Sequence, residues 1–146
     1  MNVIKDEFLA SMKSSGAIFA PANDERAIIT ASNSLQAMRA AILPLFMIEL
    51  YKTAGGIMLG DAYVFGPKEI NVAQKFPVPS IVRINHEISA ISQMRGKTVF
   101  GRNDLFWFAF DAFGTCFMLD NLTLNSMRRY DDPWKALTDC LIIGKM

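Results

Sequence analysis

The stretch LFWFAFDAFGTCFML at residues 105–119 decides the fold that the sequence predicts. Two apolar runs, LFWFAF at 105–110 and TCFML at 115–119, flank the four residues DAFG at 111–114. Two such runs around a short segment that ends in glycine are typical of an antiparallel β-hairpin. Neither run alternates apolar and polar residues, so we expect both faces of the hairpin to be covered. The run TVFG at 98–101 predicts a further strand immediately before it.

Helical patterns precede and follow these strands. Apolar residues at helical spacing predict helices over residues 3–12, from 23 towards 38, over 44–54, over 79–93 and from Pro133 onward. Pro44 suits the first turn of its helix, and Gly55-Gly56 closes that helix, with Gly55 expected in the left-handed conformation.

Shorter segments complete the prediction. Apolar residues at 57–59 and 62–65 predict two strands or a strand and a bend, and Pro77 and Pro79 predict an irregular segment over 68–80. The helix end within 31–43 and the element type within 121–130 stay open. The sequence therefore predicts one α+β domain over residues 1–146, in which N-terminal, middle and C-terminal helices cover a mostly antiparallel sheet.

The composition excludes several classes of protein. Of the 146 residues, 51% are hydrophobic and 20% charged, which is not the composition of a disordered chain. The net charge of +1 fits neither a generic polyanion binder nor an acidic mimic of nucleic acid. The longest apolar run, at 40–48, contains Pro44 and is far shorter than the ~20 residues of a membrane-spanning helix. We therefore expect no membrane partner.

Two features predict a cytoplasmic location. Lys5, Asp6 and Glu7 interrupt the first apolar residues, so no signal peptide is expected. Cys116 and Cys140 lie in apolar surroundings without metal-ligand spacing, which favours buried free thiols, with a disulfide between them as the alternative.

Few residues are candidates for catalysis. His86 is the single histidine, and Ala90 stands where the zinc motif H-E-x-x-H would need a second one. We expect Asp111 to bind the amides of the hairpin turn, and Asp131-Asp132 to cap the last helix. A carboxylate pair that includes Asp120 is the enzymatic alternative. The preferred interpretation is a non-enzyme without metal or cofactor.

Two groups of side chains are candidates for ligand binding. The basic residues lack aromatic neighbours in the same segments, so we expect solvated strand and loop ends, and no nucleic acid as partner. They are Arg95, Lys97, Arg102, Arg128 and Arg129. The hairpin aromatics could line a small-molecule pocket, although core packing is the simpler interpretation. They are Phe106, Trp107, Phe108, Phe110 and Phe117.

The order of several motifs resembles the SUKH superfamily, the SMI/KNR-like proteins. Its first motif is similar to ILP at 42–44, Tyr51, GG at 55–56, VFG at 64–66 and EI at 69–70. Its second motif is similar to FG at 100–101, DLF at 104–106 and FDAFG at 110–114. The matched family positions, for all of which we expect structural roles, are Pro44, Gly55, Gly56, Gly66, Gly101, Asp111 and Gly114.

The resemblance implies a non-enzymatic α+β domain that acts by binding. Many bacterial members of this superfamily are immunity proteins, which occupy a cognate polymorphic toxin in the cytoplasm of the producing cell. The resemblance therefore implies a toxin as the protein partner, although this chain is near neutral where immunity proteins against nucleases are often acidic. The expected exposed anchors for such a partner are Tyr63, Tyr130 and Trp134.

Overall fold

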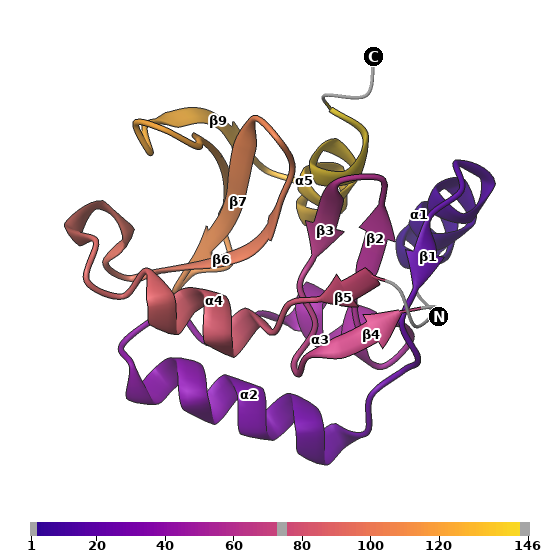
Figure 1. Ribbon diagram of the computed structural model, residues 1–146, viewed down its shortest axis with the longest axis horizontal. Coiled ribbons are helices and arrows are strands. Elements are labelled where there is room, and N and C mark those ends of the chain that lie inside the picture. Colours follow the sequence, from indigo (N-terminus) through magenta and orange to yellow (C-terminus); the bar gives the residue numbers. More distant parts are fainter. Residues whose placement is uncertain (1–2, 73–75, 144–146) are drawn as a thin grey trace.

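The computed structural model describes residues 3–72 and 76–143, which form an α+β structure with a seven-stranded antiparallel sheet (Figure 1). In spatial order the strands are β1 (Ile18–Phe19), β2 (Ile57–Leu59), β3 (Ala62–Val64), β6 (Lys97–Arg102), β7 (Phe106–Asp111), β8 (Cys116–Asp120) and β9 (Ser126–Tyr130). A separate antiparallel pair, β4 (Ile70–Val72) and β5 (Phe76–Val78), lies between β3 and β6 in the chain.

Five α-helices and one 3-10 turn occur within the described residues. They are α1 (Val3–Ser14), α2 (Glu25–Ala37), α3 (Leu45–Tyr51), α4 (Ile81–Glu87), η1 (Ser92–Met94) and α5 (Pro133–Ile142). Helix α5 packs across strands β3, β6, β7 and β8, α1 packs against α5, and α2 packs against α4. In Figure 1, α2 and α4 lie together at one end of the sheet and α5 lies beside β3 and β7.

Side-chain caps fix where three of these helices begin. The carboxylate of Asp24 accepts from the amide of Ala27, and that of Asp132 accepts from the amide of Trp134. The hydroxyl of Ser80 accepts from the first amides of α4. Each cap satisfies backbone donors that have no partner within the helix. The predicted cap at Asp132 is confirmed.

The predicted hairpin is confirmed. Strands β7 and β8 pair without interruption from Phe106 with Asp120 to Phe110 with Cys116. Asp111 closes the turn as expected, because its carboxylate accepts from the amides of Phe113 at 2.9 Å and Thr115 at 3.0 Å.

Three predicted segments differ from the structure. The helix over 79–93 is shorter, because α4 ends at Glu87 and the chain resumes as η1. The segment 68–80 is not irregular throughout: β4 and β5 form a ladder, which tolerates Pro77 because each strand of a two-stranded ribbon has a free edge. The open segment 121–130 contains β9, which pairs with β8.

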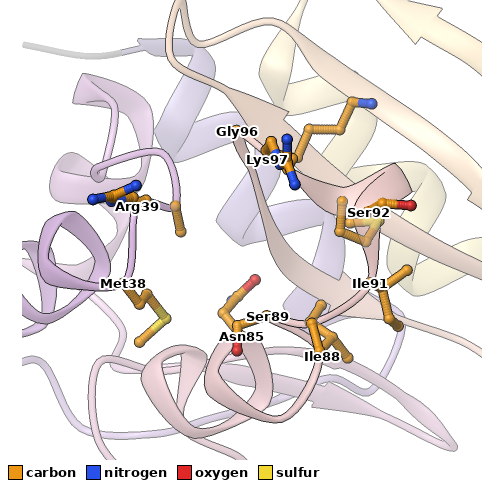
Figure 2. Close-up of a pocket in the computed structure, with 13 residues that line it drawn as sticks. Met38, Arg39, Asn85, Ile88, Ser89, Ile91, Ser92, Gly96 and Lys97 are labelled. Atoms are coloured by element: carbon orange, nitrogen blue, oxygen red, sulfur yellow. The ribbon is translucent and has the colours of Figure 1, made fainter.

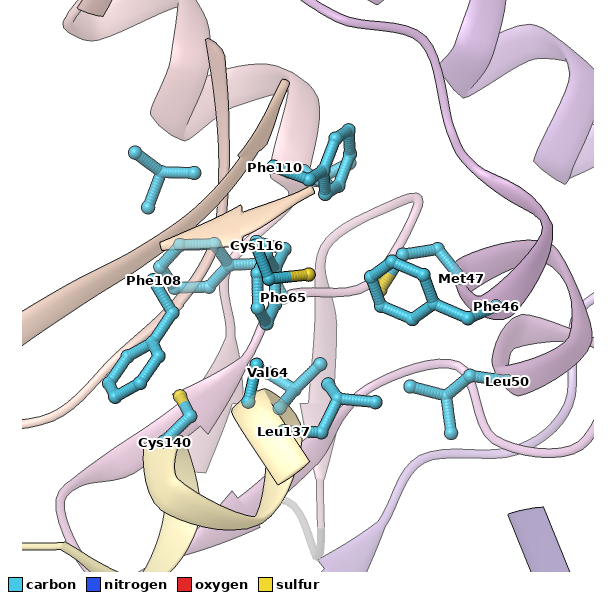
Figure 3. Close-up of a cluster of buried hydrophobic side chains, with 14 of the residues drawn as sticks. Phe46, Met47, Leu50, Val64, Phe65, Phe108, Phe110, Cys116, Leu137 and Cys140 are labelled. Carbon is cyan, nitrogen blue, oxygen red and sulfur yellow. The ribbon is translucent and has the colours of Figure 1, made fainter. Parts of the chain in front are cut away.

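The core forms where α3 and α5 meet the sheet (Figure 3). Phe46 from α3 meets the edges of Phe100 and Phe110 at centroid distances of 6.0 and 6.2 Å. Phe100 and Phe110 stack at 5.8 Å. Aromatic pairs in these geometries contribute about 0.5–1.5 kcal/mol beyond the burial of their area.

Close backbone packing explains three of the matched glycines, which are Gly55, Gly66 and Gly101. Gly55, expected in the left-handed conformation, has no positive φ; its neighbour Gly56 does, at 136°. A side chain on Gly55 would collide with Pro21, and one on Gly66 would collide with the backbone of Gly55. A Cβ on Gly101 would lie 2.6 Å from the carbonyl oxygen of Tyr63.

Two further findings concern the cysteines and the length of the helices. Cys116 and Cys140 are free and buried, as predicted. Over the described ranges 3–72 and 76–143, no helix combines the length and the apolar character needed to span a bilayer.

Candidate interaction face

The sheet has one face covered by α5 and one that helices leave partly open, which we call the outer face. Side chains alternate along a strand, so Phe108 and Phe110 point into the core while Trp107 and Ala109 point to the outer face. Phe108, Ala109 and Phe110 are fully buried, but Trp107 is only partly buried. The expected cover on both faces therefore holds in the middle of β7 and fails near its start.

A row of three side chains crosses the outer face. Tyr63 of β3 pairs with Arg102 of β6, and Arg102 pairs with Trp107 of β7. The guanidinium of Arg102 lies 5.4 Å from the centroid of the Tyr63 ring. This cation–π contact holds the charge at the surface between two aromatic side chains.

A β-bulge places Arg102 on the outer face. The register between β6 and β7 shifts between Val99 and Gly101. Phe100 stacks in the core, and a Cβ on Gly101 would meet the sulfur of Cys140 on α5, so consecutive residues face the same side. Without the bulge, strict alternation would direct Arg102 into the core.

Two exposed leucines lie in loops at the end of the sheet where β6 ends and β7 begins. Leu105, in the β6–β7 loop, is 51% exposed, and Leu122, in the β8–β9 loop, is 89% exposed. The amide of Asn121 donates to the carbonyl of Leu105 at 3.2 Å, which joins the two loops. We call Tyr63, Arg102, Trp107, Leu105 and Leu122 the Arg102 patch.

Asp120 holds the second loop in place. Its carboxylate accepts from the amides of Leu122 at 2.8 Å and Thr123 at 2.9 Å. The hydrogen bonds from the Thr123 and Leu122 amides lower the pKa of Asp120 below its ordinary value. The ionised carboxylate therefore stabilises the turn that presents Leu122.

Two of the three expected anchors are not at the surface. Tyr130 is 4% exposed and its hydroxyl donates to Asp139, because the last residue of β9 faces α5. Trp134 is 8% exposed and packs against the rings of Phe8 and Phe46 at 5.6 and 6.2 Å. Their expected exposure is wrong. Tyr63 alone of the three keeps part of its surface open.

The sequence predicts other roles for Arg102 and Trp107. Arg102 was expected at a solvated strand end and Trp107 in the core or a pocket. The position of Trp107 between Phe106 and Phe108 could have indicated that it faces away from the core, because neighbours in a strand face opposite sides. For Arg102 the alternation of neighbouring side chains predicts the wrong face of the sheet, because a bulge lies between Val99 and Arg102.

The candidate catalytic groups do not converge. His86 is exposed on α4, whereas Cys116 of β8 and Cys140 of α5 are buried in the core. Burial, with smaller contributions from Asp111 and Asp132, raises the pKa of Cys116 to about 12, so this thiol stays protonated at neutral pH. No group of three metal-ligating side chains occurs within the part of the chain that the structure describes.

Basic and aromatic residues are closer together than the sequence predicts. The ammonium of Lys97 lies 5.7 Å from the Phe117 ring centroid, as Arg102 lies over Tyr63. Strand pairing creates both contacts between residues that are distant in the chain. In each pair a protein cation already occupies a ring face on which a base would stack.

Two of the five hairpin aromatics form part of the core. Phe108 and Phe110 are fully buried against Phe100, at centroid distances of 6.4 and 5.8 Å. Core packing, the simpler interpretation of the sequence, therefore holds for these two, whereas Phe106, Trp107 and Phe117 are only partly buried.

No family model matches the sequence, and no curated protein matches it significantly.

Proposed function

We propose that this chain is a non-enzymatic, cytoplasmic protein-interaction domain of the SUKH type. Its partner is a cognate bacterial toxin, which it neutralises by occluding part of the toxin surface. The Arg102 patch carries this proposal, because Tyr63, Arg102 and Trp107 lie side by side on three neighbouring strands, with Leu105 and Leu122 exposed in the adjoining loops.

The residue types of the patch suit a protein interface. Tyrosine, tryptophan and arginine are the most frequent energetic anchors of protein–protein contacts. Arg102 supplies a charge that is already oriented by the Tyr63 ring, so little side-chain freedom is lost on binding. The matching toxin surface would offer apolar side chains around a carboxylate that pairs with Arg102.

The packing of the motif segments supports the SUKH resemblance. The amide of Phe65, in the first motif, donates to the carbonyl of Phe100, in the second, at 2.8 Å. Val64 pairs with Gly101 in the sheet, and the hydroxyl of Tyr51 donates to the carbonyl of Phe65. The matched positions therefore lie in one contiguous unit.

Co-expression tests the proposal. The chain is produced in a bacterial host together with the toxin encoded by the adjacent gene, and survival is scored. We expect the wild-type chain to protect the host and the double variant Arg102→Ala, Trp107→Ala to lose protection while remaining folded. Phe113→Ala is the matched control, because Phe113 is an aromatic side chain 93% exposed in the β7–β8 turn, outside the patch.

Three outcomes would contradict the proposal. Unchanged killing in the presence of the wild-type chain would remove the toxin as partner. Full protection by the double variant would remove the Arg102 patch as the contact surface. Binding of a single-stranded oligonucleotide in place of the toxin, lost in the same double variant, would assign the patch to nucleic acid instead.

A further inference from the structure

A cavity of about 430 Å³ lies between the end of α2 and the segment that leads from α4 into β6 (Figure 2). Met38 and Arg39 form one side, and Ile88 and Ile91 contribute apolar side chains on another. Its volume is within the range of small-molecule sites, which are about 300–1,000 Å³.

The base of the cavity is rigid. Asn85, which is 3% exposed, donates to the carbonyls of Ile81 at 2.7 Å and Val99 at 2.9 Å. Its side-chain oxygen accepts from the amide of Val99 at 2.8 Å. The two bonds to Val99 fasten α4 to β6 at the base of the cavity, and the bond to Ile81 fixes the Asn85 side chain within α4.

The charges at the cavity have one sign. Its lining includes Arg39, Arg95 and Lys97, and no lining residue is acidic. Within the described residues neither Arg39 nor Arg95 has an ion-pair partner, whereas the ammonium of Lys97 lies over Phe117. Two guanidinium groups are therefore available to an anion at the cavity.

The backbone at Arg39 adds a second observation. Arg39 has φ of 62°, and it directly follows Met38, the C-cap residue of α2. Glycine is the residue that adopts this conformation without cost at a helix end. An arginine at this position places a guanidinium at the cavity at the expense of backbone strain, and such strain is concentrated at functional sites.

We infer that this cavity binds a small organic anion. The ligand carries one phosphate or carboxylate group, which Arg39 and Arg95 bind, and an apolar body that contacts Met38, Ile88 and Ile91. Guanidinium groups bind both oxyanions through paired N–H donors, so the two head groups share the recognition chemistry. The site is separate from the Arg102 patch, because Lys97 and Arg102 stand at opposite ends of β6.

Titration with three probes tests the inference. Phenyl phosphate, 3-phenylpropionate and the neutral 3-phenylpropanol are added to the full chain, and amide chemical shifts and calorimetric affinities are measured. We expect at least one anion to bind, with shifts at Ser89 and Gly96 on the cavity wall, and 3-phenylpropanol to bind at least ten-fold more weakly. The tighter of the two anions identifies the head group.

Variants separate the charge from the fold. Arg39→Gln with Arg95→Gln should weaken anion binding at least ten-fold, and the control Arg26→Gln, an exposed arginine near the other end of α2, should leave it unchanged. Arg39→Gly should raise the melting temperature while weakening binding, which no folding defect would do. Failure of both anions to bind, equal binding of the neutral probe, or unchanged binding by the double variant would overturn the inference.

Discussion

The hydroxyl of Tyr130 donates to the carboxylate of Asp139 across 2.7 Å, which joins the last strand of the sheet to α5. Asp139 is 4% exposed and also accepts from Arg128 at 3.0 Å and from Lys135 at 3.1 Å. Burial and the hydrogen bond to Asp139 raise the pKa of Tyr130. This contact keeps α5 against the face of the sheet opposite to the Arg102 patch.

Removal of this carboxylate should destabilise the protein. We expect Asp139→Ala to lower the free energy of unfolding by about 2–3 kcal/mol, because the Tyr130 hydroxyl loses its acceptor in a buried position. Tyr130→Phe should cost about 1–2 kcal/mol, because the Asp139 carboxylate keeps its contacts with Arg128 and Lys135. The control Lys135→Gln removes only the exposed lysine partner of Asp139, which keeps its contacts with Tyr130 and Arg128, and should cost less than about 1 kcal/mol. Urea denaturation measures all three, and equal values for Asp139→Ala and Lys135→Gln would contradict the assignment.

Asn85 should contribute as much as a large core residue. Strand β3 pairs with β6 at Gly101 and Arg102. At Val99, beyond the end of this pairing, the Asn85 side chain supplies the hydrogen-bond partners that a neighbouring strand would otherwise provide. Asn85→Leu should lower the free energy of unfolding by about 2–4 kcal/mol, because two buried backbone groups lose their partners. Asn33→Leu, at an exposed asparagine on α2, is the control and should change stability by less than about 0.5 kcal/mol. A small effect of Asn85→Leu would show that water can replace this side chain.

Stability should fall at alkaline pH in part through Cys116. The pKa of its thiol is raised from 9.0 to about 12 on folding, so the folded state favours the protonated thiol. The resulting stabilisation is fully present below pH 9 and is lost as the pH rises from 9 towards 12. Cys116→Ala should therefore show a shallower decrease of the unfolding free energy over this interval than the wild-type chain. Parallel pH profiles of the two proteins would contradict the raised pKa.

The structure confirms the predictions that depend on neighbouring residues. The β7–β8 hairpin, the Asp111 turn and the Asp132 cap each follow from a few consecutive residues. The burial of Tyr130 depends instead on how β9 packs against α5, and that of Trp134 depends on how α5 packs against α1 and α3. The expectation that these two residues are exposed anchors for a partner is therefore wrong.

The candidate site was harder to predict than the hairpin, because strand register assembles it. Tyr63 and Arg102 are 39 positions apart in the numbering and become cross-strand partners only after β4, β5 and α4 are inserted between β3 and β6. The bulge before Gly101 then reverses the direction of Arg102. One residue of register decides whether that charge lies at the surface, and the amino-acid pattern of β6 does not reveal the bulge.

The indole N–H resonances of the two tryptophans test the central claim most directly. Trp107 lies in the Arg102 patch and Trp134 is buried under α1 and α3, so the second is an internal control for the first. When the ¹⁵N-labelled chain is titrated with the toxin proposed as its partner, we predict that the Trp107 indole resonance shifts or broadens and that the Trp134 indole resonance changes much less. Formation of the complex with an unchanged Trp107 resonance would contradict the assignment of this surface to the partner.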